Sequence, residues 1–397
     1  MKRIALTLAA FALTGAMAFA DDAAPATPAP VQVTIGDWGR QVLGIGNQDN
    51  SGYYAGLGTS WGSSPRIVGL NIQATYAYGG FSITPSADNG TFSLTDQNKA
   101  WITPLPGLTF ESGITLETDT WRGTSDFGSD DWIRLQGYQQ NSFTFFRLGE
   151  GGYLTDVNYN KDGIGFWAGL SGTGSSGQAA ATDLGSALQA GAAYTIPSGP
   201  QIKAQYIGYA VNGTTLQGTT RTGVADGTPF GQIQVAANLQ KIIPGLNQEI
   251  GVDIPTNGSD AGYVFQASDI TDFTIQQTTL HLLALVTDFN GNLTGSGGSG
   301  YGLLGGVGAD YDFGNKVTLN TDIRYGNALG SSGGASTTNV PALAGGLIGI
   351  SKGFDHGLIG VGFEYSTAGI AGGNSTNVTS NNSVGHWVIP VRLEESF

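Results

Sequence analysis

Apolar and polar residues alternate with a period of two along most of this chain. In the clearest segment, 67–78, one face carries Val68, Leu70, Ile72, Ala74, Tyr76 and Tyr78, and the other carries Gly69, Asn71, Gln73 and Thr75. Successive side chains of a strand point to opposite faces, so this pattern predicts strands with one apolar face. The pattern recurs at 108–118, 164–170, 188–196, 202–206, 232–240, 249–254, 316–325, 359–365 and 386–397. We expect about 16 strands, within a range of about 14 to 18, with the greatest ambiguity at 81–103, 143–160 and 287–300.

Connections between these segments differ in length in a regular way. Short connections lie at 104–107, 160–163, 197–200, 243–247, 313–316 and 353–357, and long runs rich in Gly, Ser, Thr and Asn lie at 171–186, 212–228, 330–340 and 368–383. A sandwich or propeller would distribute loop lengths more evenly. The asymmetry predicts an all-β fold, a transmembrane antiparallel up-and-down β-barrel with short periplasmic turns and long extracellular loops.

Aromatic residues support a folded barrel. The chain has 65 glycines but also 18 Phe, 15 Tyr and 7 Trp, whereas disordered chains are poor in aromatics. Several lie where strands meet short turns: Trp101, Tyr159, Tyr194, Tyr311, Phe313 and Phe397. Membrane barrels place aromatic girdles at that level, so we expect these rings at the membrane interface.

The N-terminal residues predict export. Residues 1–20 have the layout of a signal peptide, with Lys2 and Arg3, an apolar run and a small-residue site before Asp21. Residues 21–32 read as an Ala/Pro-rich periplasmic spacer and 33–397 as one barrel domain. No later apolar run reaches the roughly 20 residues of a membrane helix, and the lack of cysteine excludes disulfides.

Charge narrows the function further. Without Lys2 and Arg3, 14 basic residues face 30 acidic ones, a formal net charge of −16, which argues against nucleic-acid partners. About 16 strands would leave an aqueous channel. Charged residues on or beside the polar strand faces are then the pore-lining candidates: Glu111, Glu117, Asp119, Lys203, Glu249, Asp253, Asp322, Arg324, Glu364 and Arg392.

The segment 119–147 mixes charges of both signs with aromatic residues. Its candidates for narrowing a pore are Arg122, Asp130, Asp131, Arg134 and Arg147, because rings of charged side chains set selectivity in channels. A surface loop held by its own ion pairs explains the same composition equally well.

Catalytic and metal-binding patterns are weak in this sequence. The three histidines, His281, His356 and His386, have no partner at a metal-ligand spacing. Two G-x-S-x-G strings, at 58–62 and 349–353, precede no helix pattern, and G-S-G-G-S-G at 295–300 lies in a linker-like run. We therefore expect neither an enzyme nor a cofactor.

The last residues, H-W-V-I-P-V-R-L-E-E-S-F at 386–397, resemble the C-terminal signature of bacterial outer-membrane β-barrels. The resemblance implies that Phe397 is the signal read by the outer-membrane assembly machinery. Taken with the strand rhythm, the chain resembles porin-like barrels, and G-D-W-G-R at 36–40, S-P-R at 64–66 and D-T-W-R-G at 119–123 are similar to those of spirochaetes.

This resemblance implies a channel in the bacterial outer membrane for passive diffusion of small hydrophilic solutes or ions, with outer-membrane lipid as its surroundings and homo-oligomerisation left open. The acidity favours cations or neutral solutes. Three alternatives remain: a barrel that carries adhesin loops, a transporter of hydrophobic solutes, and an exported soluble β-protein. The transporter would need an apolar seam in the lumen and a plug, for which 31–46 is the candidate.

Overall fold

All regular structure in the described part of the chain is β. The computed structural model describes residues 31–47, 53–58, 66–83, 85–88, 91–94, 98–116, 153–170, 188–208, 215–216, 219–220, 231–240, 242–256, 263–289, 300–327, 343–366 and 386–396. No helix among these residues has the length and apolar character needed to cross a membrane.

The N-terminal half of the barrel contains β1 (Gln32–Asn47), β2 (Tyr53–Gly58), β3 (Arg66–Tyr76), β4 (Gly79–Ile83), β5 (Pro85–Asp88), β6 (Thr91–Leu94), β7 (Lys99–Leu105), β8 (Leu108–Leu116), β9 (Tyr153–Lys161), β10 (Ile164–Leu170), β11 (Leu188–Thr195) and β12 (Gln201–Gly208). Two short strands, β13 (Thr215–Leu216) and β14 (Thr219–Thr220), pair only with each other.

The C-terminal half contains β15 (Gly231–Asn238), β16 (Leu246–Pro255), β17 (Tyr263–Ile275), β18 (Thr278–Phe289), β19 (Gly300–Gly314), β20 (Val317–Asn327), β21 (Leu343–Gly353), β22 (Gly357–Ser366) and β23 (His386–Ser396).

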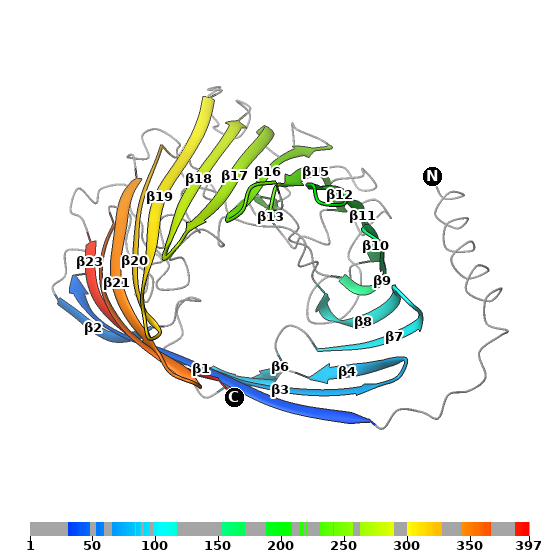
Figure 1. The fold of residues 1–397 in the computed structure, drawn as a ribbon, viewed down its shortest axis with the longest axis horizontal. Helices are drawn as coiled ribbons and strands as arrows, with labels where there is room; N and C mark the ends of the chain where they lie inside the picture. The colour runs from blue at the N-terminus through cyan, green and yellow to red at the C-terminus, as the bar shows by residue number, and fades with distance from the viewer. Residues whose placement is uncertain are drawn as a thin grey trace.

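Apart from β13 and β14, these strands form an antiparallel up-and-down sheet (Figure 1). The sheet has 18 strand positions, which we call staves because some of them hold two short strands in line. β2 and β3 share one stave, because both pair with the same edge of β1, and β5 and β6 extend the β4–β7 pair. Every following stave pairs with its sequence neighbour. At the other end of the chain, β23 pairs with the free edge of β1, so the succession of pairings returns to its first strand.

The number of staves lies at the upper limit of the predicted range. The expectation of about 16 was low, and the strands without a named alternating segment include β1, which the sequence suggested as a plug candidate, and also β17 and β19. β1 is a wall strand paired on both edges, so the interpretation of 31–46 as a plug is wrong for the described residues 32–46.

One end of the barrel carries only tight connections. Eight turns of two to seven residues join β3–β4, β7–β8, β9–β10, β11–β12, β15–β16, β17–β18, β19–β20 and β21–β22. The six predicted short connections are all among them, and the turns at Ala77–Tyr78 and Gln276–Gln277 were not predicted. Asp162 and Gly163 show why such turns are so short: both have positive φ, 54° and 82°, as a two-residue hairpin turn requires.

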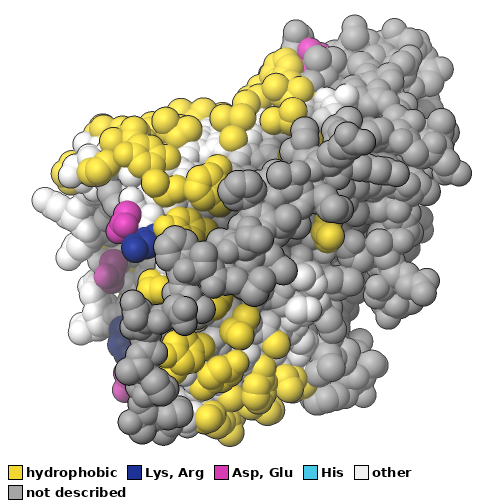
Figure 2. Space-filling view, turned by 90° about the vertical axis from the view of Figure 1, so that its right-hand side faces the viewer, with side chains coloured by type: hydrophobic (Ala, Val, Ile, Leu, Met, Phe, Trp, Pro, Cys, Tyr) yellow, Lys and Arg dark blue, Asp and Glu magenta, His cyan; other side chains and the backbone are white. Residues whose placement is uncertain are grey.

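Side chains on the two faces of the wall differ in kind. On β22, for example, Ile359, Val361 and Phe363 are exposed, while Glu364 is fully buried on the other face. Away from the turns, most exposed positions of the described strands are apolar. Figure 2 shows such side chains over much of the described outer surface, with most of the visible charges along its left edge. An apolar exterior and a polar interior is the arrangement of a membrane-spanning barrel.

Among the described residues, the aromatic rings expected near the short turns lie on the outer face, with one exception. Tyr159 lies beside the exposed Phe166, with 6.4 Å between ring centroids. Tyr194, Tyr311 and Phe313 are exposed on the outer face, and the rings of Tyr311 and Phe313 meet edge to face at 4.8 Å between centroids. Trp101 instead lies on the inner face, beside Gly80, because its strand neighbour Ile102 takes the outward position. Phe397 lies outside the described residues.

Asp269 is a carboxylate on the outer face. It accepts hydrogen bonds from Gln248 Nε2, at 3.1 and 2.9 Å to its two oxygens, and from Thr271 Oγ1 at 2.7 Å. It lies beside an apolar groove of about 790 Å³ that is lined in part by Ala267 and Ala284. Its hydrogen bonds reduce the cost of placing a charge on a lipid-facing wall.

Candidate functional site: the charged inner face of the barrel

The inner face of the wall holds most of the charged side chains of the described strands. Each strand contributes alternate residues, so strand register decides which charges meet. The carboxylates on this face outnumber the permanent cations; the acids are Glu111, Asp156, Glu249, Asp253, Asp272, Asp310, Asp322, Glu364 and Glu394, and the cations are Lys99, Lys203, Arg324 and Arg392.

The first cluster spans β7, β8 and β9. Glu111 faces Asp156 directly in the β8–β9 register, which by itself would be repulsive. Lys99 Nζ reduces the repulsion between the two carboxylates by donating to both Glu111 oxygens, at 3.1 and 3.3 Å. Asn158 Nδ2 donates to Asp156 Oδ2 at 2.6 Å. The cluster leaves one net negative charge on this part of the wall if both acids are ionised.

The second cluster is a belt of amides across β10, β11, β12 and β15. Gln205 Oε1 accepts from Trp167 Nε1 at 3.1 Å and from Gln189 Nε2 at 3.2 Å, while Gln205 Nε2 donates to Gln234 Oε1 at 2.7 Å. All four side chains are buried. The side-chain hydrogen bonds of the belt therefore connect four neighbouring strands that are also paired through their backbones.

An ion pair lies next to this belt. Lys203 Nζ donates to Glu249 Oε2 at 2.6 Å, and Asn238 Nδ2 donates to the same oxygen at 3.3 Å. The two charged side chains are 0% and 1% exposed. At that burial each charge depends on its partner, because neither has water to replace it.

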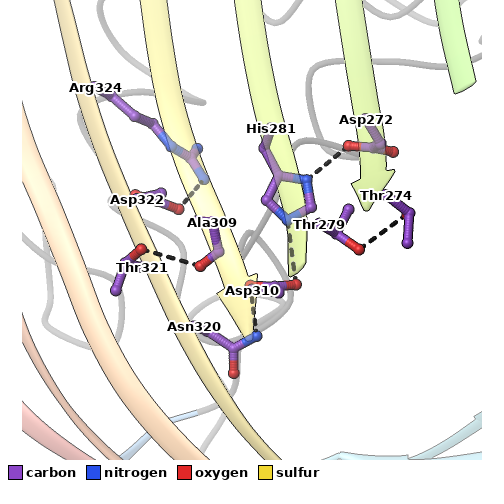
Figure 3. Close-up of polar contacts among 10 residues, drawn as sticks. All are labelled: Asp272, Thr274, Thr279, His281, Ala309, Asp310, Asn320, Thr321, Asp322 and Arg324. Carbon is purple, nitrogen blue, oxygen red and sulfur yellow. Dashed lines mark hydrogen bonds and ion pairs between the residues drawn. The ribbon is translucent and has the colours of Figure 1, made fainter. Parts of the chain in front are cut away.

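The third cluster spans β17 to β20 and is drawn in Figure 3. His281 lies between two carboxylates: Nδ1 is 2.7 Å from Asp272 Oδ1 and Nε2 is 3.2 Å from Asp310 Oδ2. Asn320 Nδ2 donates to Asp310 Oδ1 at 2.8 Å, and Arg324 Nη2 is paired with Asp322 Oδ2 at 3.0 Å. The four strands thus present a continuous polar surface at one side of the barrel.

The last strands carry further inner charges. Arg392 Nε donates to Glu394 Oε2 at 3.0 Å on β23, and the fully buried Glu364 lies on the neighbouring strand β22.

An exposed ion pair joins two of the short turns, where Lys316 Nζ donates to Asp355 Oδ1 at 2.5 Å. This hydrogen bond and the lysine charge hold the pKa of that exposed carboxyl below its usual value.

Known structures share this fold. A solved structure of the outer-membrane protein opdK from Pseudomonas aeruginosa matches with a TM-score of 0.53 at 10% identity, covering 92% of this chain and 99% of that one. OccK5 (OpdH) from the same organism matches with a TM-score of 0.52 at 11% identity, covering 92% and 98%. OccK11 (OpdR), also from that organism, matches with 0.52 at 12%, covering 92% and 96%.

The fold is that of a porin-like outer-membrane β-barrel. No protein-family model matches the sequence, and no curated protein matches it either. None of the three structures bears on the spirochaete-like motifs, so that narrower resemblance stays a prediction.

The sequence-predicted site residues fall into two groups. On the inner face lie Glu111, Lys203, Glu249, Asp253, Asp322, Arg324, Glu364 and Arg392. Outside the described residues lie Glu117, Asp119, Arg122, Asp130, Asp131, Arg134, Arg147 and Phe397. Sequence reasoning missed Lys99, Asp156, Asp272, His281 and Asp310. For His281 the segment T-L-H-L-L-A-L gave no signal, because Leu283 and Leu285 share its face.

Catalytic geometry is not supported at the one G-x-S-x-G string that is described in full. Ser351 lies within strand β21 and pairs with Thr318 on one side and Gly360 on the other. A nucleophile elbow needs a sharp turn between a strand and a helix, so this string is no such site. Among the described residues no group of three or more His, Asp or Glu side chains is arranged to hold a metal ion.

Gly191 provides a test of the amide belt. A Cβ at this position would lie 2.3 Å from Trp167 Cζ2 and 2.7 Å from Gln205 Cβ, so the indole occupies the space that a side chain would need. We expect Gly191→Ala to push the indole off Gln205 and to lower the free energy of unfolding in lipid vesicles by about 1–3 kcal/mol. Urea unfolding followed by tryptophan fluorescence measures it.

The matched control is Gly305→Ala. The nearest atom to a Cβ there is 3.9 Å away, so the added methyl group meets no obstacle. Equal unfolding energies for the two variants would contradict a packed contact between Gly191 and Trp167.

Proposed function

We propose that the protein is a bacterial outer-membrane channel through which small hydrophilic solutes and ions diffuse passively. The observation that carries this proposal is the two-faced wall, with exposed aliphatic and aromatic side chains outside and charged clusters inside. An outward apolar band suits lipid, and a charged interior suits water. A wall of 18 staves is also wide enough to enclose an aqueous channel, unlike a barrel of about eight strands.

The excess of inner carboxylates over inner cations supports a preference for cations or neutral solutes. Rings of charged side chains set the sign of the ions that a channel favours. The pore-lining role proposed for Glu111 rests on its inward position and its 16% exposed side chain. Glu249, Asp253 and Glu364 also lie on the inner side of the strands but are at most 1% exposed, so they would act on permeating ions through their field and not through contact. The segment 119–147 is the proposed constriction, and Phe397 the proposed signal for the assembly machinery; both rest on the sequence alone.

A transporter of hydrophobic solutes has less support. The apolar inner side chains Ile270, Leu283 and Leu285 form a small patch on β17 and β18. Polar residues bound the patch, with His281 at one end and Gln266 at the other, so no apolar seam runs along the described wall.

Solute influx into liposomes tests the proposal. Purified protein is reconstituted into vesicles, and swelling is recorded with neutral sugars of increasing size. Passive diffusion predicts influx that needs no energy source and becomes slower as the sugar becomes larger. Vesicles that contain folded protein but swell no faster than empty vesicles would overturn the proposed function.

A further inference from the structure

The positions of two carboxylates around His281 favour a protonated ring. Each ring nitrogen faces a carboxylate oxygen, Nδ1 that of Asp272 at 2.7 Å and Nε2 that of Asp310 at 3.2 Å. A neutral imidazole donates from one nitrogen only, so its other nitrogen would point a lone pair at an anion. The arrangement in Figure 3 is therefore that of an imidazolium held between two acids.

Among the described residues, the charged groups that face His281 are acidic or paired. From β17 the facing charge is Asp272, and from β19 it is Asp310, whose second oxygen accepts from Asn320 on β20. Asp322, also on β20, lies level with His281 across Gly308, and it is paired with Arg324. With the acids ionised, the three-residue cluster carries one net negative charge when His281 is protonated and two when it is not.

The cluster lies where permeating ions would pass it. His281 is close to the tight β17–β18 turn at Gln276–Gln277 and therefore to the short-turn mouth of the barrel. The side chains of Asp272 and Asp310 are 20% and 28% exposed, while the histidine is 7% exposed. The two carboxylates face the lumen, and the protonation state of the imidazole ring between them sets the net charge of the cluster.

We propose that the Asp272–His281–Asp310 cluster is a selectivity-determining site of the channel, in which the proton on His281 sets the preference for cations. This inference rests on the proposed function. Loss of the proton adds one unit of negative charge at the mouth, and a ring of negative charge raises the local concentration of cations over anions.

Reversal potentials in a potassium chloride gradient test the site, with reconstituted protein in planar bilayers at about pH 6 and about pH 9.5, a range that brackets much of the titration of histidine in proteins. We expect the potassium-to-chloride permeability ratio to rise about two- to fivefold with pH, as for one charge at about 5–8 Å from the ions in water that is screened by about 0.1 M salt. His281→Gln, fixed as neutral, should show the high ratio at both pH values.

The matched control is His356→Gln, a change in the exposed β21–β22 turn, which should keep the pH response of the unchanged protein. Asp310→Asn removes one charge from the cluster and should lower the ratio at both pH values, which gives a second reading if His281→Gln fails to fold. Heat-modifiable gel mobility shows which variants are folded.

The outcomes separate the two proposals. Folded protein with no stepwise conductance would overturn the channel itself. Stepwise conductance with a permeability ratio that does not change with pH would overturn the role of His281 and leave the channel standing. An unchanged pH response in folded His281→Gln, or an unchanged ratio in folded Asp310→Asn, would also overturn it.

Discussion

Replacing Lys203 with methionine is expected to lower the free energy of unfolding by about 3–5 kcal/mol, because it leaves Glu249 as a buried charge without its cation. The two side chains are 0% and 1% exposed and 2.6 Å apart, so water cannot take the place of the ammonium group. Asn238 remains as a donor to Glu249 Oε2, but a neutral amide does not compensate a full charge. Urea unfolding in lipid vesicles measures the loss.

The double variant Lys203→Met with Glu249→Leu is the control for this prediction. Removing both charges together avoids the isolated carboxylate, and exchanges of this kind are often neutral or stabilising. We expect the double variant to recover most of the stability that Lys203→Met loses. A double variant as unstable as the single one would show that the loss comes from packing around Lys203 rather than from charge.

The second large effect concerns the outer face. Val361 lies near the middle of β22 and is 45% exposed, which on this wall means exposure to lipid. Val361→Lys should destabilise the folded protein by about 2–4 kcal/mol, the cost of a lysine at the bilayer midplane. Equilibrium unfolding in vesicles gives the value.

Phe354 provides the comparison for Val361, because the two residues are expected at different depths in the membrane. Phe354 is also exposed, at 57%, but lies in the turn between β21 and β22, where a lysine reaches water. Phe354→Lys should cost about 0–1 kcal/mol, as at the interface. If both substitutions cost the same, the outer face of β22 is not in contact with the bilayer interior.

Alternation made the strands and their faces predictable wherever apolar residues occupy every second position. In β23, Ile389 and Leu393 were expected outside with Arg392 inside, and the structure places them so. The tight connections were predictable for a different reason, because pairs such as Asp162 and Gly163 favour the backbone conformation that a two-residue turn needs.

The pattern failed where a strand breaks the alternation. Asp269 and Thr271 occupy outward positions of β17, so these positions do not show the apolar period of two from which strands were predicted. Glycine-rich β19 has few side chains that could show any face. β1 mixes Asp37 and Arg40 with Val33 and Ile35, and its segment was expected as a plug only in the alternative of a transporter for hydrophobic solutes.

The clusters of the inner face could not be predicted, because they depend on register between strands. Asp272, His281 and Asp310 come from three different strands, and only the pairings Asp272↔His281 and Thr279↔Asp310 bring them together. Trp101 was misplaced for a different reason, because its strand neighbour Ile102 takes the outward position. A sequence gives the face of a strand more readily than its neighbours.

Single-channel recording in planar bilayers tests the central claim, that this wall encloses a continuous aqueous path. The account predicts discrete conductance steps when folded protein inserts, with a reversal potential in a salt gradient whose sign shows a preference for cations. Folded, heat-modifiable protein that inserts without conductance, or that passes anions in preference to cations at neutral pH, would contradict it.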